Sequence, residues 1–398
     1  MEGKGNQFNG ISIDSRLSRW TSSQAQVAAP EEKAELPLDP HCRALWHWDP
    51  RRPQEGGHMR QPELCISSWH RRLDSRNPDS QTVELDREFL DTVIVHGREY
   101  QKYSIENRTY FGPVDEPDQE EAQRLDHQQR VFQRIFDDRL IFPPIHRLRR
   151  VLDCGHGAAS WAIEVAEQYP NCELLVKVIG VDIAPHMSPD DVPNNLWLQV
   201  DDLNRRFTFP ANHFDLVHSR LLATGINRSR WPSYIRDIVR VLRPGGWVQM
   251  TEIYFNVQSD NGSITDQHAL RRWSTQYMRA LEDRKDLRIG SRLRNFFIEA
   301  GLVEVDTKMI PLPLSAWSNG RFWQVVDRDR DINADGGADP RMRDIGQYNS
   351  ENIQQLLRSL ALYPLTQRLH MSPQSYDRLV EQAQEEAENH SLKAYFPL

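Results

Sequence analysis

The sequence predicts an α/β fold: a doubly wound, mainly parallel sheet with helical N- and C-terminal additions. Two observations predict this class. Short apolar runs alternate with segments whose apolar residues recur every three or four positions, and three of the consecutive runs end in aspartate. Strands that alternate with helices in this way form parallel sheets covered on both faces. With 398 residues, the chain is long enough for one enzyme-sized core with flanking segments.

The expected elements follow one another along the chain, identified by their apolar spacing. Helices are expected over residues 121–141, 161–169, 235–242, 270–281, 293–300 and 353–388. Strands are expected over residues 151–152, 174–181, 196–200, 214–217, 247–253 and 303–312. We therefore predict four regions: a poorly ordered N-terminal extension (1–85), a helical lid (86–145), the core (146–315), and an acidic insertion followed by a C-terminal helical segment (316–398). The first 40 or so residues are rich in Gly, Ser, Gln, Glu and Pro without periodicity, a composition that cannot bury enough apolar surface to become ordered.

Composition excludes several classes of protein. The formal charge is −8, from 49 basic and 57 acidic residues, which argues against broad capture of nucleic-acid backbone. No run approaches the about 18 apolar residues of a membrane helix, and the polar start lacks the centre of a signal peptide. Four cysteines without a C-x-x-C pair do not make a disulfide framework. We therefore expect no nucleic-acid or membrane partner, and a cytoplasmic location.

Two motifs imitate metal sites, but we predict no metal from either. A Cys-x4-His spacing begins at Cys42 and again at Cys65, yet structural zinc sites usually bring their ligands in closer pairs. The acidic residues 331–336 imitate the first half of a calcium loop, but Met342 stands where the bidentate Glu belongs.

The most informative stretch is residues 151–161, a strand that runs into Asp153-x-Gly155-x-Gly157 and then a helix. Glycines there let the backbone turn sharply and let a ligand approach closely. A dinucleotide site would need G-x-G-x-x-G/A, whereas Ser160 occupies the last position. A sulfonium nucleoside has no pyrophosphate, and Asp153 could organise the loop and the ligand's cationic amino group. The pattern therefore favours a sulfonium nucleoside over a nicotinamide cofactor.

Three consecutive strands end in aspartate. After Asp153, the second strand ends in Asp182, whose carboxylate can accept both ribose hydroxyls, and the third ends in Asp201 and Asp202, which can accept from the adenine amino group. Ligands of open α/β sheets bind beyond the carboxyl ends of the strands. The alternative is that Asp182 and Asp202 only cap the helices that follow.

These motifs resemble the class I S-adenosylmethionine-dependent methyltransferases, which have a Rossmann-like fold, and more narrowly the fungal LaeA-like branch of secondary metabolism. The similarity runs in pieces from about residue 86 to residue 398. It is carried by HGREYQKY, RLDHQQRVF, VLDCGHGAASWAIEVAEQYP, VIGVDIAP, VDDL, NHFDLVHSR, VLRPGGWVQMTE, GQYN and KAYFPL.

The resemblance implies S-adenosylmethionine as cofactor and a role for each matching residue. It places Asp153, Gly155 and Gly157 in the cofactor loop, Asp182 at the ribose, and Asp201 with Asp202 at the adenine. His218 then ends the fourth strand facing the cofactor, and Tyr103 lies in the lid.

The chain departs from the family pattern at three places. Ala159 replaces the third loop glycine, and the segment 172–178 is longer than the pattern. The chain stops at residues 395–398, where the family usually continues into a last antiparallel strand, so we expect a missing edge strand.

Methyl transfer is an in-line displacement at a methyl carbon already activated by a sulfonium, so much of its rate comes from holding nucleophile and methyl in line. A general base is needed for an alcohol or a phenol, and less so for a carboxylate. His218, Glu252 and His268 are the candidates, each with a structural alternative: a cofactor contact, a cap or ion-pair partner, and a surface residue, respectively.

We expect a methyltransferase that acts on a small-molecule acceptor of fungal secondary metabolism, with oxygen favoured over nitrogen or carbon. One alternative is a LaeA-like nuclear regulator with velvet-type partners, although no compact Lys/Arg import cluster is present. Another is a cyclase or isomerase in which the sulfonium acts only as a charge.

Overall fold

The computed structural model describes residues 22–27, 85–114, 120–169, 176–317 and 340–398. The chain divides into two compact units, one comprising Met1–Ala28 with Val83–Leu398 and the other Ala29–Thr82. Every described residue belongs to the first unit. Both motifs that imitate metal sites lie mainly outside the described residues.

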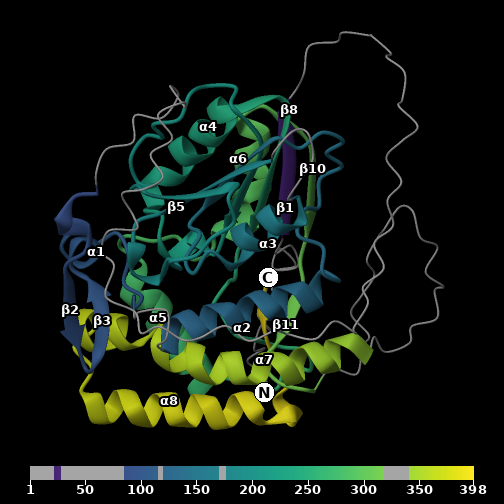
Figure 1. The fold of residues 1–398 in the computed structure, drawn as a ribbon. Helices are drawn as coiled ribbons and strands as arrows, with labels where there is room; N and C mark the ends of the chain where they lie inside the picture. The colour runs from purple at the N-terminus through teal and green to yellow at the C-terminus, as the bar shows by residue number, and fades with distance from the viewer. Residues whose placement is uncertain (1–21, 28–84, 115–119, 170–175, 318–339) are drawn as a thin grey trace, which may run out of the picture. The chain divides into compact units, whose positions relative to one another are not determined.

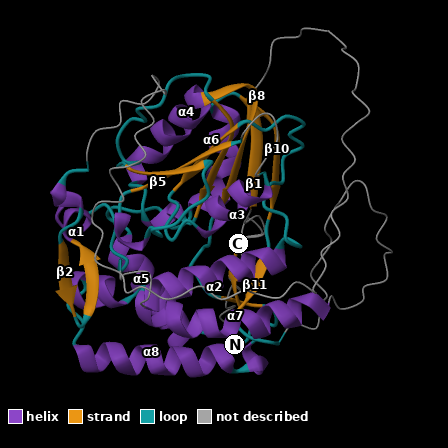
Figure 2. Cartoon of the chain, viewed as in Figure 1, coloured by secondary structure: helices purple, strands orange, loops and turns teal. Residues whose placement is uncertain are grey.

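The first unit is built on a sheet of seven described strands in the order β10-β1-β8-β7-β4-β5-β6 (Figures 1 and 2). The five strands from β8 to β6 run parallel, and β1 is antiparallel to both of its neighbours. This is the predicted α/β class. The strands are β1 (Ser22–Val27), β4 (Arg150–Cys154), β5 (Lys177–Asp182), β6 (Leu196–Val200), β7 (Phe214–Arg220), β8 (Leu242–Thr251) and β10 (Leu302–Lys308).

Helices cover the sheet and extend beyond one end of it. Figure 1 shows α2, α7 and α8 side by side below the strands, with α5 beside α8. The main helices are α1 (Lys102–Asn107), α2 (Glu120–Ile135), α3 (Ser160–Gln168), α4 (Trp231–Val241), α5 (Ala269–Leu281), α6 (Leu293–Glu299), α7 (Pro340–Ser359) and α8 (Pro373–Glu388).

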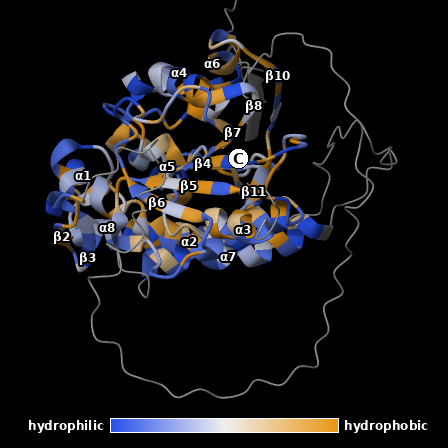
Figure 3. Ribbon diagram, turned by 45° about the horizontal axis from the view of Figure 1, so that its top comes forward, coloured by the Kyte–Doolittle hydropathy of each residue, from blue (hydrophilic) through white to orange (hydrophobic). Residues whose placement is uncertain are grey.

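Alternation along the central strands divides the core between two faces. Val151 and Leu216 pack with α3 in one hydrophobic cluster, whereas their neighbours Leu152 and Val217 pack with α4 in another. Successive side chains of a strand point to opposite faces, and parallel strands are buried on both. Figure 3 shows the consequence: the central strands carry long hydrophobic stretches, and hydrophilic residues are common on α1 and α8.

The N-terminal segment contributes a strand to this sheet, which corrects two expectations. Ser22–Val27 lies within the region expected to be poorly ordered, yet it forms β1 between β8 and β10. Ser23 is opposite Met250 of β8 on one side and Thr307 of β10 on the other. The antiparallel strand expected to be missing at the C-terminus is therefore supplied by Ser22–Val27.

The C-terminal residues form a second, smaller sheet. Its strands are β11 (Pro311–Pro313), β12 (Ala394–Pro397) and β9 (Gln258–Ser259). The strand expected over 303–312 is therefore divided between β10 and β11. The lid region also contains a hairpin of β2 (Thr92–Val95) and β3 (Arg98–Gln101), so it is not entirely helical.

The helix expected over 121–141 ends at Ile135, because Asp137 and Asp138 adopt left-handed backbone angles that end a helix.

Among the described residues, no helix has the length and hydropathy needed to cross a membrane. Nor do the described ranges bring three His, Cys, Asp or Glu side chains together in a way that could hold a metal ion.

Candidate functional site

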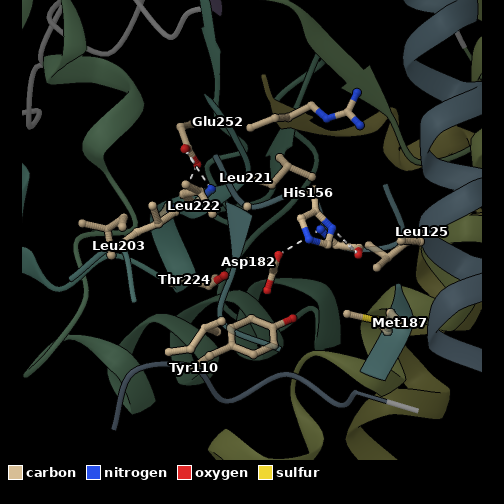
Figure 4. A pocket seen from close by; sticks show the side chains of 18 of the residues that line it. Tyr110, Leu125, His156, Asp182, Met187, Leu203, Leu221, Leu222, Thr224 and Glu252 are labelled. Atoms are coloured by element: carbon tan, nitrogen blue, oxygen red, sulfur yellow. Dashed lines mark hydrogen bonds between the residues drawn. The ribbon is translucent and has the colours of Figure 1, made fainter. Parts of the chain in front are cut away.

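A cavity lies at the carboxyl ends of β4, β5, β6, β7 and β8, where an open α/β sheet binds its ligands (Figure 4). Its walls come from the loops after these strands, the lid segment after α1, and the helices α2 and α7. Of the predicted site residues, those that line it are Gly155, Gly157, Asp182, Asp201, Asp202 and Glu252.

The loop after β4 adopts backbone angles that favour glycine. Gly155 has φ +76°, and a Cβ there would lie 2.4 Å from Cδ2 of Leu222. Gly157 has φ +55°, but a Cβ there would meet only Leu125 at 3.4 Å. Ala159 has φ +62°, so the alanine at the third loop position adopts a conformation costly to residues with a Cβ.

Asp182 is held rigidly at the end of β5. Its Oδ2 accepts a hydrogen bond from the Gly157 N–H (2.9 Å) and its Oδ1 accepts one from the Ala184 N–H (3.0 Å). A carboxylate oxygen has two lone pairs, so each oxygen can still accept one hydroxyl. Asp182 therefore joins the glycine loop to the second strand and can receive the two hydroxyls of a ribose.

Asp201 and Asp202 lie beside Asp182 after β6. The Asp201 N–H donates to the Asp182 carbonyl (3.0 Å), and the Asp202 N–H donates to Oδ1 of Asp201 (2.8 Å). Oδ1 of Asp202 also accepts from both the backbone and the side-chain N–H groups of Asn204. Burial raises the pKa of Asp201. The structure thus brings the acids of the second and third strand ends together.

Asp153 and His218 do not line this cavity. Nδ1 of His218 is 2.8 Å from Oδ1 of Asp153, and the His218 ring stacks on Trp161 with ring centres 3.7 Å apart. Side chains alternate along a strand, so Asp153 points to the same face of the sheet as Val151 in β4, and His218 to the same face as Leu216 in β7. This is the face covered by α3. Burial lowers the pKa of His218, although the Asp153 carboxylate opposes this.

Glu252, at the end of β8, organises the turn after β7. Its Oε1 accepts from the Leu222 N–H and its Oε2 from the Ala223 N–H, both at 2.9 Å. Burial raises the pKa of Glu252 to about 8, although these two N–H groups favour the charged form.

His268 precedes α5, where its Nδ1 accepts a hydrogen bond from the Thr265 N–H (3.0 Å), and it is not among the cavity residues.

The lid meets the cavity through Tyr110, not through the predicted Tyr103. The Tyr103 hydroxyl accepts from Arg205 (3.0 Å), and its ring packs on Phe89. Tyr110 lines the cavity and lies over Gly112, where a Cβ would collide with the Tyr110 ring and hydroxyl. The signal available in the sequence was this glycine two residues after a tyrosine.

Part of the cavity lining is apolar and was not recognised from sequence. The apolar side chains there come from α2, from α7 and the residue after it, and from the segment after β8, and are Leu125, Phe132, Ile253, Phe255, Leu356 and Leu360. Arg124, also in this wall, forms a buried pair with Glu121, with its Nε 3.0 Å from Oε2. The α2 periodicity predicted packing on the core, and nothing in it distinguishes cavity-facing positions.

The residues at the strand ends fit S-adenosylmethionine. Asp182 offers a fixed carboxylate for the ribose hydroxyls, Asp201 and Asp202 offer acceptors beside it, and Gly155 with Gly157 keeps the adjacent loop free of side chains.

Comparisons with known proteins agree with this geometry. Residues 151–246 match a family model described as a methyltransferase domain. The chain is 27% identical over 308 residues to the secondary metabolism regulator LAE1 of Cochliobolus heterostrophus, an alignment covering 75% of this chain and 90% of the relative. It is 27% identical over 307 residues to the protein-methionine methyltransferase laeA of Emericella nidulans (75% and 73% covered). It is 25% identical over 324 residues to the methyltransferase pytC of Aspergillus terreus (81% and 90% covered).

Proposed function

Because the chain is a class I S-adenosylmethionine-dependent methyltransferase with a LaeA-like sequence, we propose that it methylates an oxygen atom of a small molecule in fungal secondary metabolism. The observation that carries the proposal is the apolar part of the cavity lining, from α2, α7 and the segment after β8, which lines the same cavity as the cofactor residues. Such a wall suits a small, mainly apolar acceptor. A biosynthetic enzyme of this kind would act in the cytoplasm.

Within the proposal, binding and orientation come from the strand ends. The cofactor supplies a methyl group activated by its sulfonium. Asp182, Asp201 and Asp202 hold the nucleoside, and the side chains of α2 and α7 exclude water from the acceptor. Holding the acceptor atom close and aligned supplies most of the acceleration.

Among the three candidate bases, Glu252 is the one whose side chain lines the cavity. Its pKa, raised by burial to about 8, leaves a minor fraction of Glu252 as the carboxylate at neutral pH, and this fraction can accept a proton. We therefore assign Glu252 as the base where the acceptor is an alcohol or a phenol. His218 instead holds the Asp153 carboxylate beneath the cofactor loop.

The second candidate function is regulatory, with a protein as acceptor or partner. The names of two relatives favour it: one is called a secondary metabolism regulator and another a protein-methionine methyltransferase. A regulator of this kind would act in the nucleus.

One labelling experiment tests the proposal. The protein is incubated with S-adenosylmethionine carrying an isotopically labelled methyl group and an extract of the producing fungus, which is then separated into small-molecule and protein fractions. Label in the small-molecule fraction, absent with Asp182→Ala, supports the proposal. Label confined to protein overturns it in favour of the regulatory function. Conversion of an extract component without consumption of S-adenosylmethionine overturns it in favour of a cyclase or isomerase.

A further inference from the structure

Lys285 is a fully buried lysine beneath the cavity, with 0% of its surface exposed. Its Nζ donates to the carbonyls of Thr109 and Gly225 (2.8 Å to the latter) and to Oδ1 of Asn227 (2.9 Å). An ammonium has three donors, and all three are used. No carboxylate in the described part of the chain forms an ion pair with it, so these neutral acceptors take the place of a counter-ion.

The backbone around Lys285 is fixed against the loop after β7. The Lys285 N–H donates to the Leu281 carbonyl at the end of α5 (2.8 Å), and Lys285 forms an isolated antiparallel bridge with Asn227. The Arg228 N–H donates to the Arg284 carbonyl (2.7 Å). The ammonium therefore projects from a fixed position towards the lid.

The acceptors of Lys285 belong to the cofactor end of the cavity. Thr109 and Gly225 both line it. The Gly225 carbonyl also accepts from Nδ2 of Asn204 (3.1 Å), and Asn204 in turn holds Asp202. Lys285 thus connects the lid to the loop that orients an adenine-side acid.

Tyr110 follows Thr109 directly, so fixing the Thr109 carbonyl sets the direction in which the Tyr110 side chain leaves the backbone. The Tyr110 side chain enters the cavity on the side of Asp182 (Figure 4). Burial raises the pKa of Tyr110, and the nearby carboxylates, including Asp182, add to the effect. Tyr110 is therefore placed where it can contact a nucleoside held by Asp182.

We infer that Lys285 is a positioning residue of the cofactor site, which holds the lid through the Thr109 carbonyl and so fixes Tyr110 in the cavity. Its role is to keep the lid and the loop after β7 in the arrangement that binds the cofactor. The inference concerns cofactor binding alone, so it stands or falls independently of the proposed acceptor.

A double-mutant cycle on cofactor affinity tests the inference. Calorimetry with S-adenosylhomocysteine compares the full-length wild type, Lys285→Met, Tyr110→Ala and the double variant, with Lys308→Met as the control at an exposed lysine of β10. We expect each single variant at positions 285 and 110 to raise Kd at least tenfold. The double variant should be little weaker than Lys285→Met, because residues that act through one another are not additive.

Two further readouts separate positioning from general stability. Hydrogen exchange of the ligand-free protein should quicken in residues 102–114 for Lys285→Met and stay unchanged for Lys308→Met. Additive effects on Kd, or a lowered Tm with unchanged Kd and unchanged lid exchange, would overturn the inference. If Lys285→Met does not fold, Asn227→Ala removes one of the three acceptors and takes its place in the cycle. Additivity with Tyr110→Ala would again overturn the inference.

Discussion

Replacement of Asp182 by alanine should weaken cofactor binding strongly, because this carboxylate has two tasks. It accepts hydrogen bonds from the Gly157 and Ala184 N–H groups, and its remaining lone pairs can accept the ribose hydroxyls. Hydrogen bonds to a charged group contribute about 1.5 to 3 kcal/mol. Losing even one of the two ribose contacts should raise Kd by about 10- to 150-fold, so this is the smallest effect expected. Loosening of the glycine loop, whose N–H loses its acceptor, adds to this loss.

Calorimetric titration with S-adenosylhomocysteine measures the effect. Asp182→Asn keeps an oxygen for one N–H group but loses the charge, so its Kd should fall between those of the wild type and Asp182→Ala. Asp266→Ala, at an exposed position before α5, serves as the control and should bind normally. Equal affinity of Asp182→Ala and the wild type would refute the assignment of Asp182 to the ribose.

Three further predictions concern the turn, the loop and the N-terminal strand. Burial raises the pKa of Glu252 from 4.5 to about 8, so the folded protein keeps this proton where the unfolded chain has lost it. The free energy of unfolding should therefore fall as pH rises from 4.5 to about 8, by at most about 1.4 kcal/mol per pH unit. Denaturant titrations at several pH values should show that Glu252→Gln loses this part of the pH dependence. The same dependence of unfolding free energy on pH in the variant and the wild type would contradict the raised pKa of Glu252. Gly155→Ala should lower Tm and cofactor affinity more than Gly157→Ala. Both variants carry about 1 to 2 kcal/mol of backbone strain, but only Gly155→Ala also displaces Leu222. A larger loss of Tm in Gly157→Ala would contradict the described conformation of the loop. Gln24→Pro should destabilise the protein by about 1 to 3 kcal/mol, because proline cannot donate within a strand paired on both sides; an unchanged free energy of unfolding would exclude β1 from the sheet.

Much of the sheet could be predicted from sequence because its strands and helices carry strong local patterns. The apolar runs at β5, β6 and β8 and the three-and-four spacing of α4 each indicate one element without knowledge of its neighbours. β1 could not be predicted in this way. Its residues, SSQAQV, are mostly small or polar, and they become a strand by pairing with β8 and β10, which are distant in sequence.

The site residues differ in the same way: some follow from local strand patterns, and others depend on contacts between distant segments. Asp182, Asp201 and Asp202 were predictable because strand ends meet at one edge of a parallel sheet whatever the rest of the chain does. His218 also follows a strand pattern, but alternation directs its side chain to the α3 face and away from the cavity. Tyr110, Arg124 and Lys285 were missed because their roles depend on contacts between segments far apart along the chain.

The most direct test of the central claim is a crystal structure of the full-length protein with S-adenosylhomocysteine. We predict that the nucleoside lies in the cavity at the strand ends, with both ribose hydroxyls within hydrogen-bonding distance of the Asp182 carboxylate and the adenine beside Asp202. The sulfur should point towards the apolar side chains that α2 and α7 contribute to the lining. A cofactor bound elsewhere, or a ribose that does not contact Asp182, would contradict the account.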